Sequence, residues 1–126
     1  MKPETVEWLD RADGDLRVAE REIGAADPVL HVVCFLSQQA AEKYIKALME
    51  ERCIVPRRTH DLIVLLDLVG EALDPPARAR IAALSTFGVS ARYPGMDADM
   101  ESAEEAVATA RLVKTLVEHL LGSTVA

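Results

Sequence analysis

The sequence predicts an all-α fold, an antiparallel helical bundle of four main helices and a shorter fifth, in one domain over residues 1–126. Half of the residues are hydrophobic but only 4% are aromatic, so aliphatic side chains must fill the core. Ala, Leu and Val dominate long segments with few Gly or Pro, which favours helix over strand. Apolar residues recur at steps of three and four, as they do on one face of a helix. Short connectors between such helices are typical of bundles.

The first predicted helix covers about residues 4–23, whose apolar side chains share one face, and Gly24 is its stop signal. The second follows Asp27 and Pro28 and continues to about Arg52. Asp is a good N-cap, and Pro suits the first helical position. The first half of this helix is apolar nearly all round, which predicts a central position in the fold or in an interface.

The third predicted helix extends from His60 to about Ala72, and Thr59 is placed to cap its start. The fourth is predicted over residues 77–91, after two prolines at positions 75 and 76 have ended the third. The third helix carries an inner apolar stripe of Leu62, Leu65, Leu66 and Val69.

The last predicted helix begins between Asp97 and Ala103, and Gly122 closes it. Pro94-Gly95 precedes it and suits the two central positions of a type II turn. Ser102-x-x-Glu105 has the form of a capping box. A reversal of the chain followed by a long amphipathic helix therefore completes the predicted bundle.

Charge and composition exclude several classes of protein. The formal net charge is −7 at pH 7, so the chain repels a phosphate backbone unless its basic residues cluster locally. Cys34 and Cys53 lack zinc-ligand spacing and fit a reducing compartment. The N-terminus has no apolar signal region, and no apolar run is long enough to span a bilayer. We therefore expect a cytoplasmic protein with no membrane segment.

The common cofactor and metal motifs are missing from the sequence. It contains no P-loop, no Gly-rich dinucleotide turn and no helical His pair for zinc. The acidic residues from Asp97 to Glu105 match no calcium loop, and carboxylates are favourable at the start of a helix. We therefore expect no cofactor and no metal site.

The polar side of the second helix and a histidine are the first candidates for function. Gln38, Gln39, Glu42 and Lys46 form either a plain solvent face or a docking surface for a partner. His60 follows a small basic cluster and can serve as acid, base or ligand near neutral pH. The alternative is a histidine that only hydrogen-bonds locally at a helix start.

Arg92 and Tyr93 form the third candidate group. In the structural interpretation, Arg92 stabilises a helix C-terminus before the chain turns. In the functional interpretation, both residues stand at the mouth of a pocket, where a guanidinium grips a phosphate with two hydrogen bonds.

Three sequence blocks, taken in order, resemble the HEPN domain family over nearly the whole chain. They are Gln38-Gln39-Ala40-Ala41-Glu42-Lys43-x-x-Lys46-Ala47, Thr59-His60-Asp61-Leu62 and Arg92-Tyr93-Pro94-Gly95. The resemblance implies a bundle of four main helices with a shorter extra one, and commonly a homodimer. It also implies a companion, a minimal nucleotidyltransferase, in pairs where the HEPN protein resembles a toxin and the transferase neutralises it.

The resemblance also implies a possible activity. Active members of the family are metal-independent ribonucleases that carry an Arg and a His separated by four to six residues. The Arg holds the scissile phosphate, and the His does the acid–base work across the dimer. Counted from Arg92, the corresponding positions here hold Asp97, Ala98 and Asp99. A carboxylate there repels the phosphate and cannot donate a proton at neutral pH. The resemblance therefore transfers only Arg92, as a phosphate contact.

Three functional hypotheses follow, in order of preference. The first is a partner or regulatory module that dimerises and pairs with a minimal nucleotidyltransferase. The second is nucleotide binding at the dimer seam, with Arg92, Tyr93, Lys43 and His60 near the phosphates. The third is a metal-independent endoribonuclease toxin that uses Arg92 and recruits His60 in place of the missing His. Tyr93 is also a candidate target of the transferase, since family members carry a modified Tyr near the Arg.

Overall fold

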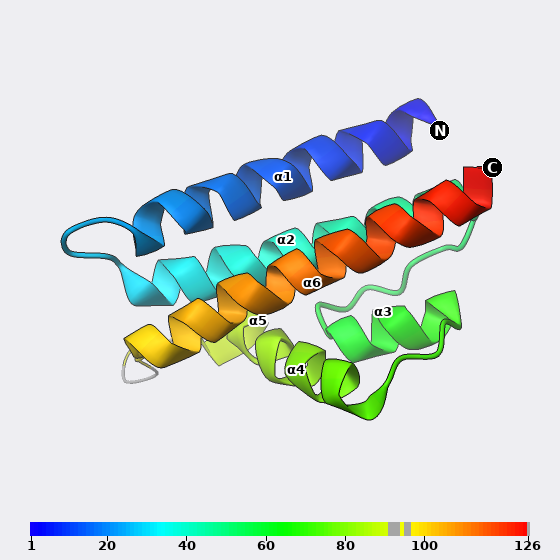
Figure 1. Cartoon of the computed structure of the whole chain (residues 1–126). Helices are drawn as coiled ribbons and strands as arrows, with labels where there is room; N and C mark the ends of the chain where they lie inside the picture. The colour runs from blue at the N-terminus through cyan, green and yellow to red at the C-terminus, as the bar shows by residue number, and fades with distance from the viewer. Residues whose placement is uncertain (91–93, 95–96, 126) are drawn as a thin grey trace.

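The computed structural model describes residues 1–90, 94 and 97–125, and in these residues the regular structure is entirely helical (Figure 1). The helices are α1 (Pro3–Ile23), α2 (Leu30–Glu51), α3 (Leu62–Val69), α4 (Pro75–Ser85), α5 (Phe87–Ser90) and α6 (Met100–Val125). The predicted all-α fold is confirmed. In length the helices are uneven, because α1, α2 and α6 each exceed 20 residues whereas α5 is a single turn of 4.

Helix α2 is the central element of the fold. It contacts all five other helices, and α1 lies antiparallel to it while α6 lies alongside it in the same direction (Figure 1). Helices α3 and α4 cover another side, reached by a segment of residues 52–61 that folds back from the end of α2 and that we call the strap. The prediction that this apolar helix is central is therefore correct.

Small side chains let the three long helices pack closely, since the distance between helix axes depends on the side chains at the contact. Cys34 is fully buried in this core, and burial raises the pKa of its thiol to about 11. The thiol therefore stays neutral at physiological pH, and Cys34 acts as a small core residue. The fully buried alanines of the long helices are Ala12, Ala19, Ala40, Ala41, Ala47, Ala103 and Ala110.

The ends of α3 differ from the prediction. Its cap is Asp61, whose Oδ1 accepts the backbone N–H of Ile63 at 3.0 Å, whereas the Thr59 hydroxyl accepts the N–H of Asp61 at 3.0 Å. Gly70 ends the helix with φ of +81°, a conformation that favours glycine. The helix is shorter than predicted because these two residues satisfy its terminal backbone groups first.

The predicted fourth helix over residues 77–91 is divided. Helix α4 ends at Ser85, and the Thr86 hydroxyl donates to the carbonyl of Ala83 at 2.8 Å before the short α5 begins. Helix α6 continues through Gly122 to Val125 instead of closing at the glycine. Among the residues that the structure describes, no helix is both long and apolar enough to cross a membrane.

Candidate functional site

A buried carboxylate organises the polar residues of α2. Glu42 is only 4% exposed, and its Oε1 lies 3.0 Å from Nδ1 of His60. Its Oε2 accepts a hydrogen bond from Lys46 Nζ at 3.0 Å. Gln38 Nε2 donates to Glu42 Oε1 at 3.3 Å and to the backbone carbonyl of His60 at 3.0 Å. We call these four residues the Glu42 network.

The regular geometry of α2 explains how the network forms. Positions 38, 42 and 46 are four residues apart, so their side chains lie one above another on one helix face. The strap then brings His60 to the same face. Within the part of the chain that the structure describes, every buried side-chain nitrogen or oxygen of a residue that is not exposed has a hydrogen-bond partner. A buried carboxylate is tolerable because its oxygens are hydrogen-bonded in this way.

The expectation that Gln38 and Glu42 are exposed on a solvent or docking face is wrong. His60 closes over Glu42, and α5 packs on Gln38 so closely that a Cβ on Gly88 would lie 3.1 Å from Gln38 Cδ. Gln38 and Glu42 are buried because two later segments of the chain, the strap and α5, cover them. Gln39 and Lys46 remain partly exposed, so the predicted partner surface stays a prediction for these two residues.

His60 has one ring nitrogen against protein and one toward solvent. The side chain is 57% exposed, and Nδ1 faces the Glu42 carboxylate. Because Glu42 is an acceptor, we assign the proton of the neutral ring to Nδ1, which leaves Nε2 as an acceptor with no hydrogen-bond partner among the residues that the structure describes. An imidazole oriented by a buried carboxylate is an arrangement suited to acid–base chemistry.

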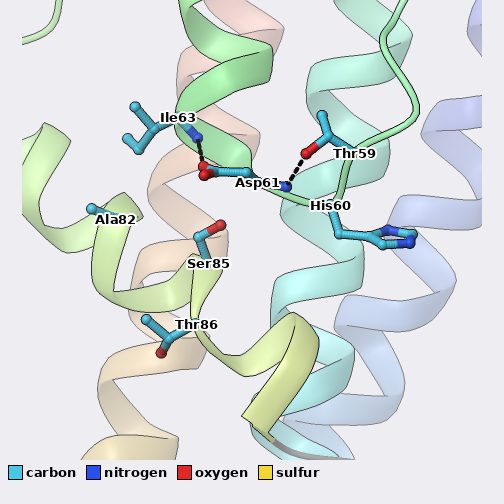
Figure 2. A pocket seen from close by; sticks show the side chains of 7 residues that line it. All are labelled: Thr59, His60, Asp61, Ile63, Ala82, Ser85 and Thr86. Atoms are coloured by element: carbon cyan, nitrogen blue, oxygen red, sulfur yellow. Dashed lines mark hydrogen bonds between the residues drawn. The ribbon is translucent and has the colours of Figure 1, made fainter.

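A pocket of about 430 Å³ lies on the other side of the His60 backbone (Figure 2). Figure 2 shows the His60 ring turned away from Ser85 and Thr86, which lie across the pocket. Ser85 Oγ accepts the backbone N–H of Leu62 at 2.9 Å, and the Asp61 carboxylate caps α3. These polar groups therefore serve the start of α3, and they do not converge with His60 on one reacting point.

Lys43, a predicted phosphate contact, lies outside the Glu42 network, and Lys46 has a second contact besides Glu42. Lys43 Nζ lies 2.5 Å from Asp15 Oδ2 on α1, so α1 already neutralises this lysine. Lys46 lies over the ring of Trp8, at 5.6 Å from its centre. Arg92 and Tyr93, which carry the predicted phosphate contact, lie outside the residues that the structure describes.

Asp99 occupies one of the three positions at which the family resemblance predicts a histidine. Its Oδ1 accepts the backbone N–H of Ser102 at 2.7 Å, and hydrogen bonding from Ser102 holds the pKa of Asp99 below its usual range. The cap of α6 is therefore Asp99, and the capping box predicted from Ser102 is not the one that forms. An ionised carboxylate committed to a helix start cannot donate a proton at neutral pH.

Replacing Asp99 by Ala is expected to lower the thermal unfolding temperature at pH 7 and to lose this effect in acid. The folded pKa of Asp99 lies below the ordinary 3.8, so its contribution is complete above that value and disappears as the pH falls through the folded pKa. Circular dichroism melts from pH 7 to about pH 3 measure this difference. Asp99→Asn keeps a cap without the charge, and Asp97→Ala is the control; an equal effect in Asp97→Ala contradicts the assignment.

A comparison with protein-family models decides the family of this chain. The HEPN domain model matches residues 5–120. The chain belongs to the HEPN domain family. The resemblance noted in the sequence is thereby confirmed, and the helical fold is HEPN-like.

Two solved structures share this HEPN fold. TT1696 from Thermus thermophilus has a TM-score of 0.78 and 25% identity, covering 94% of this chain and 98% of that protein. ST0689, an archaeal HEPN homologue, has a TM-score of 0.75 and 24% identity, covering 95% and 98% respectively. The comparison with curated proteins finds no match.

The role of Glu42 as the partner of His60 is the feature of this HEPN domain that sequence reasoning missed. The four-residue spacing of Gln38, Glu42 and Lys46 was a visible signal that these residues act together. The burial of Gln38 and Glu42 was not visible, because the residues that cover them lie at least 18 positions away in the sequence.

Proposed function

We propose that this HEPN domain is a partner module that dimerises and pairs with a minimal nucleotidyltransferase, in a toxin–antitoxin-like arrangement. One observation carries the proposal: the three positions of the family histidine hold Asp97, Ala98 and Asp99, and the Asp99 carboxylate caps α6. A chain that belongs to a family of paired proteins but lacks the family acid–base residue acts most simply through its partner. Nucleotide binding by Arg92 and Tyr93 at the dimer seam is part of this proposal.

The test is co-purification of this chain with a minimal nucleotidyltransferase from the same organism. The tagged chain is expressed with and without that protein, and the eluate is measured by size-exclusion chromatography with light scattering and by intact-mass spectrometry. We expect a dimer of this chain in a stable complex with the transferase. A nucleotidyl mass on the chain that disappears in Tyr93→Phe would identify the modified residue. A chain that elutes alone and unmodified contradicts the proposal.

The Glu42 network favours a second candidate, a metal-independent endoribonuclease. In this hypothesis, His60 Nε2 removes the proton of the ribose 2′-hydroxyl while Glu42 stabilises the imidazolium through Nδ1. The freed 2′-oxygen would then attack the adjacent phosphorus, held by Arg92, and form a 2′,3′-cyclic phosphate. The bond from phosphorus to the 5′-oxygen of the next ribose would break, and that oxygen would take a proton from water. We place this candidate second because His60 and Arg92 together depart from the family motif.

The ribonuclease hypothesis predicts RNA cleavage in the presence of EDTA by the purified dimer. We expect His60→Gln and Arg92→Ala to abolish cleavage, and His119→Gln on α6 is the control that removes a histidine elsewhere. Gel analysis of a labelled RNA provides the measurement. Intact RNA after long incubation removes this candidate, while the pairing proposal remains open to its own test.

A further inference from the structure

The strap carries a local positive charge in an acidic protein. The chain has a net charge of −7, yet the strap contains Arg52, Arg57, Arg58 and His60 against a single carboxylate, Asp61, which caps α3. Arg52 is neutralised by Glu71 at 2.8 Å. The positive charge of this segment is therefore concentrated on the adjacent pair Arg57 and Arg58.

Neither of these two arginines meets a carboxylate within the part of the chain that the structure describes, and both are exposed. Two like charges at neighbouring positions repel each other, so the adjacency of these two arginines does not stabilise the fold. Most other arginines of the described residues are used differently, in ion pairs with carboxylates. These are Arg11 with Glu7, Arg78 with Asp67, Arg80 with Glu105 and Arg111 with Glu20.

The end of the strap is held in place, so the two guanidiniums are presented on an anchored segment. The backbone N–H of Thr59 donates to the carbonyl of Arg57 at 2.9 Å, which closes a turn. His60 is fixed by Glu42 through its ring and by Gln38 through its carbonyl. An anchored loop loses less conformational entropy on binding than a mobile one does.

We propose that the strap binds a phosphate-bearing ligand, with Arg57 and Arg58 as its contacts and His60 beside them. The planar guanidinium matches two phosphate oxygens, and two adjacent arginines supply the charge that a phosphate requires. The proposal uses arginines other than Arg92, and it rests neither on the pairing with a nucleotidyltransferase nor on ribonuclease activity. A nucleotide and the backbone of a single-stranded nucleic acid both present this chemistry.

The test compares two double variants with the same loss of charge. Arg57→Gln/Arg58→Gln removes the proposed contacts, and Arg17→Gln/Arg21→Gln removes two exposed arginines of α1 that also lack a carboxylate partner among the described residues. Fluorescence anisotropy with a short labelled single-stranded RNA and calorimetry with ATP, both in EDTA, measure binding. Circular dichroism confirms that both variants are folded, as expected for changes at exposed positions.

We expect the strap variant to weaken binding roughly tenfold or more, while the α1 variant changes it little. If RNA binds, the strap variant should reduce the slope of log affinity against log salt by about 1.4, about 0.7 for each lost phosphate contact. Strap-dependent binding of RNA alone assigns a polynucleotide, and binding of ATP alone assigns a mononucleotide. The proposal is overturned if neither probe binds at low salt, or if both variants weaken binding equally.

Discussion

Replacing Glu42 by Ala is expected to lower the free energy of unfolding by about 3 kcal/mol, the low end of the range for breaking a buried charge pair. The variant leaves Lys46 and Gln38 without the carboxylate that satisfies them. The effect falls at the low end because Lys46 is 19% exposed and the His60 side chain is 57% exposed, so water partly replaces the lost partner.

Urea unfolding followed by far-ultraviolet circular dichroism measures this loss, with Glu42→Gln as the conservative comparison. Gln keeps the shape and one acceptor oxygen, so it should lose less stability than Ala. The control is Glu7→Ala, which removes a carboxylate from an exposed pair with Arg11 and should cost well under about 1 kcal/mol. An equal, small effect of Glu42→Ala and Glu7→Ala would show that the Glu42 network contributes little to stability.

Replacing Leu65 by Ala should have an effect of similar size, about 3 kcal/mol, for a different reason. Leu65 is fully buried, and deleting its side chain leaves a cavity in addition to the lost transfer energy. Helix α3 has only 8 residues, too few to be stable alone in water, so its packing against the core keeps it folded. Because α3 begins directly after the strap, its loosening also disturbs His60.

The matched control for this cavity is Leu68→Ala on the same helix. Leu68 is only partly buried, so the same chemical change should cost clearly less. Urea unfolding with an unchanged slope is the measurement, because an unchanged slope attributes the shift in midpoint to stability alone. If the two variants lose equal stability, Leu65 is not the residue that anchors α3 to the core.

Most of the fold could be predicted because helix signals are local. The periodicity of apolar residues and stop signals such as Gly24 are read from neighbouring positions, and they located all of the main helices. Errors arose where two residues compete for one role. Asp61 and not Thr59 caps α3, and Asp99 and not Ser102 caps α6, because helix geometry admits one cap and several candidates stood within reach.

By itself, the amino-acid sequence determined the all-α class, the HEPN family and the long amphipathic helices. Each of these follows from patterns repeated over many residues, which a single long-range contact does not alter. Only the tertiary structure decided that Glu42 is buried and holds His60, and that Lys43 pairs with Asp15 on α1. The physical reason is that burial of a polar side chain depends on which distant segment covers it. That packing depends on the whole chain at once.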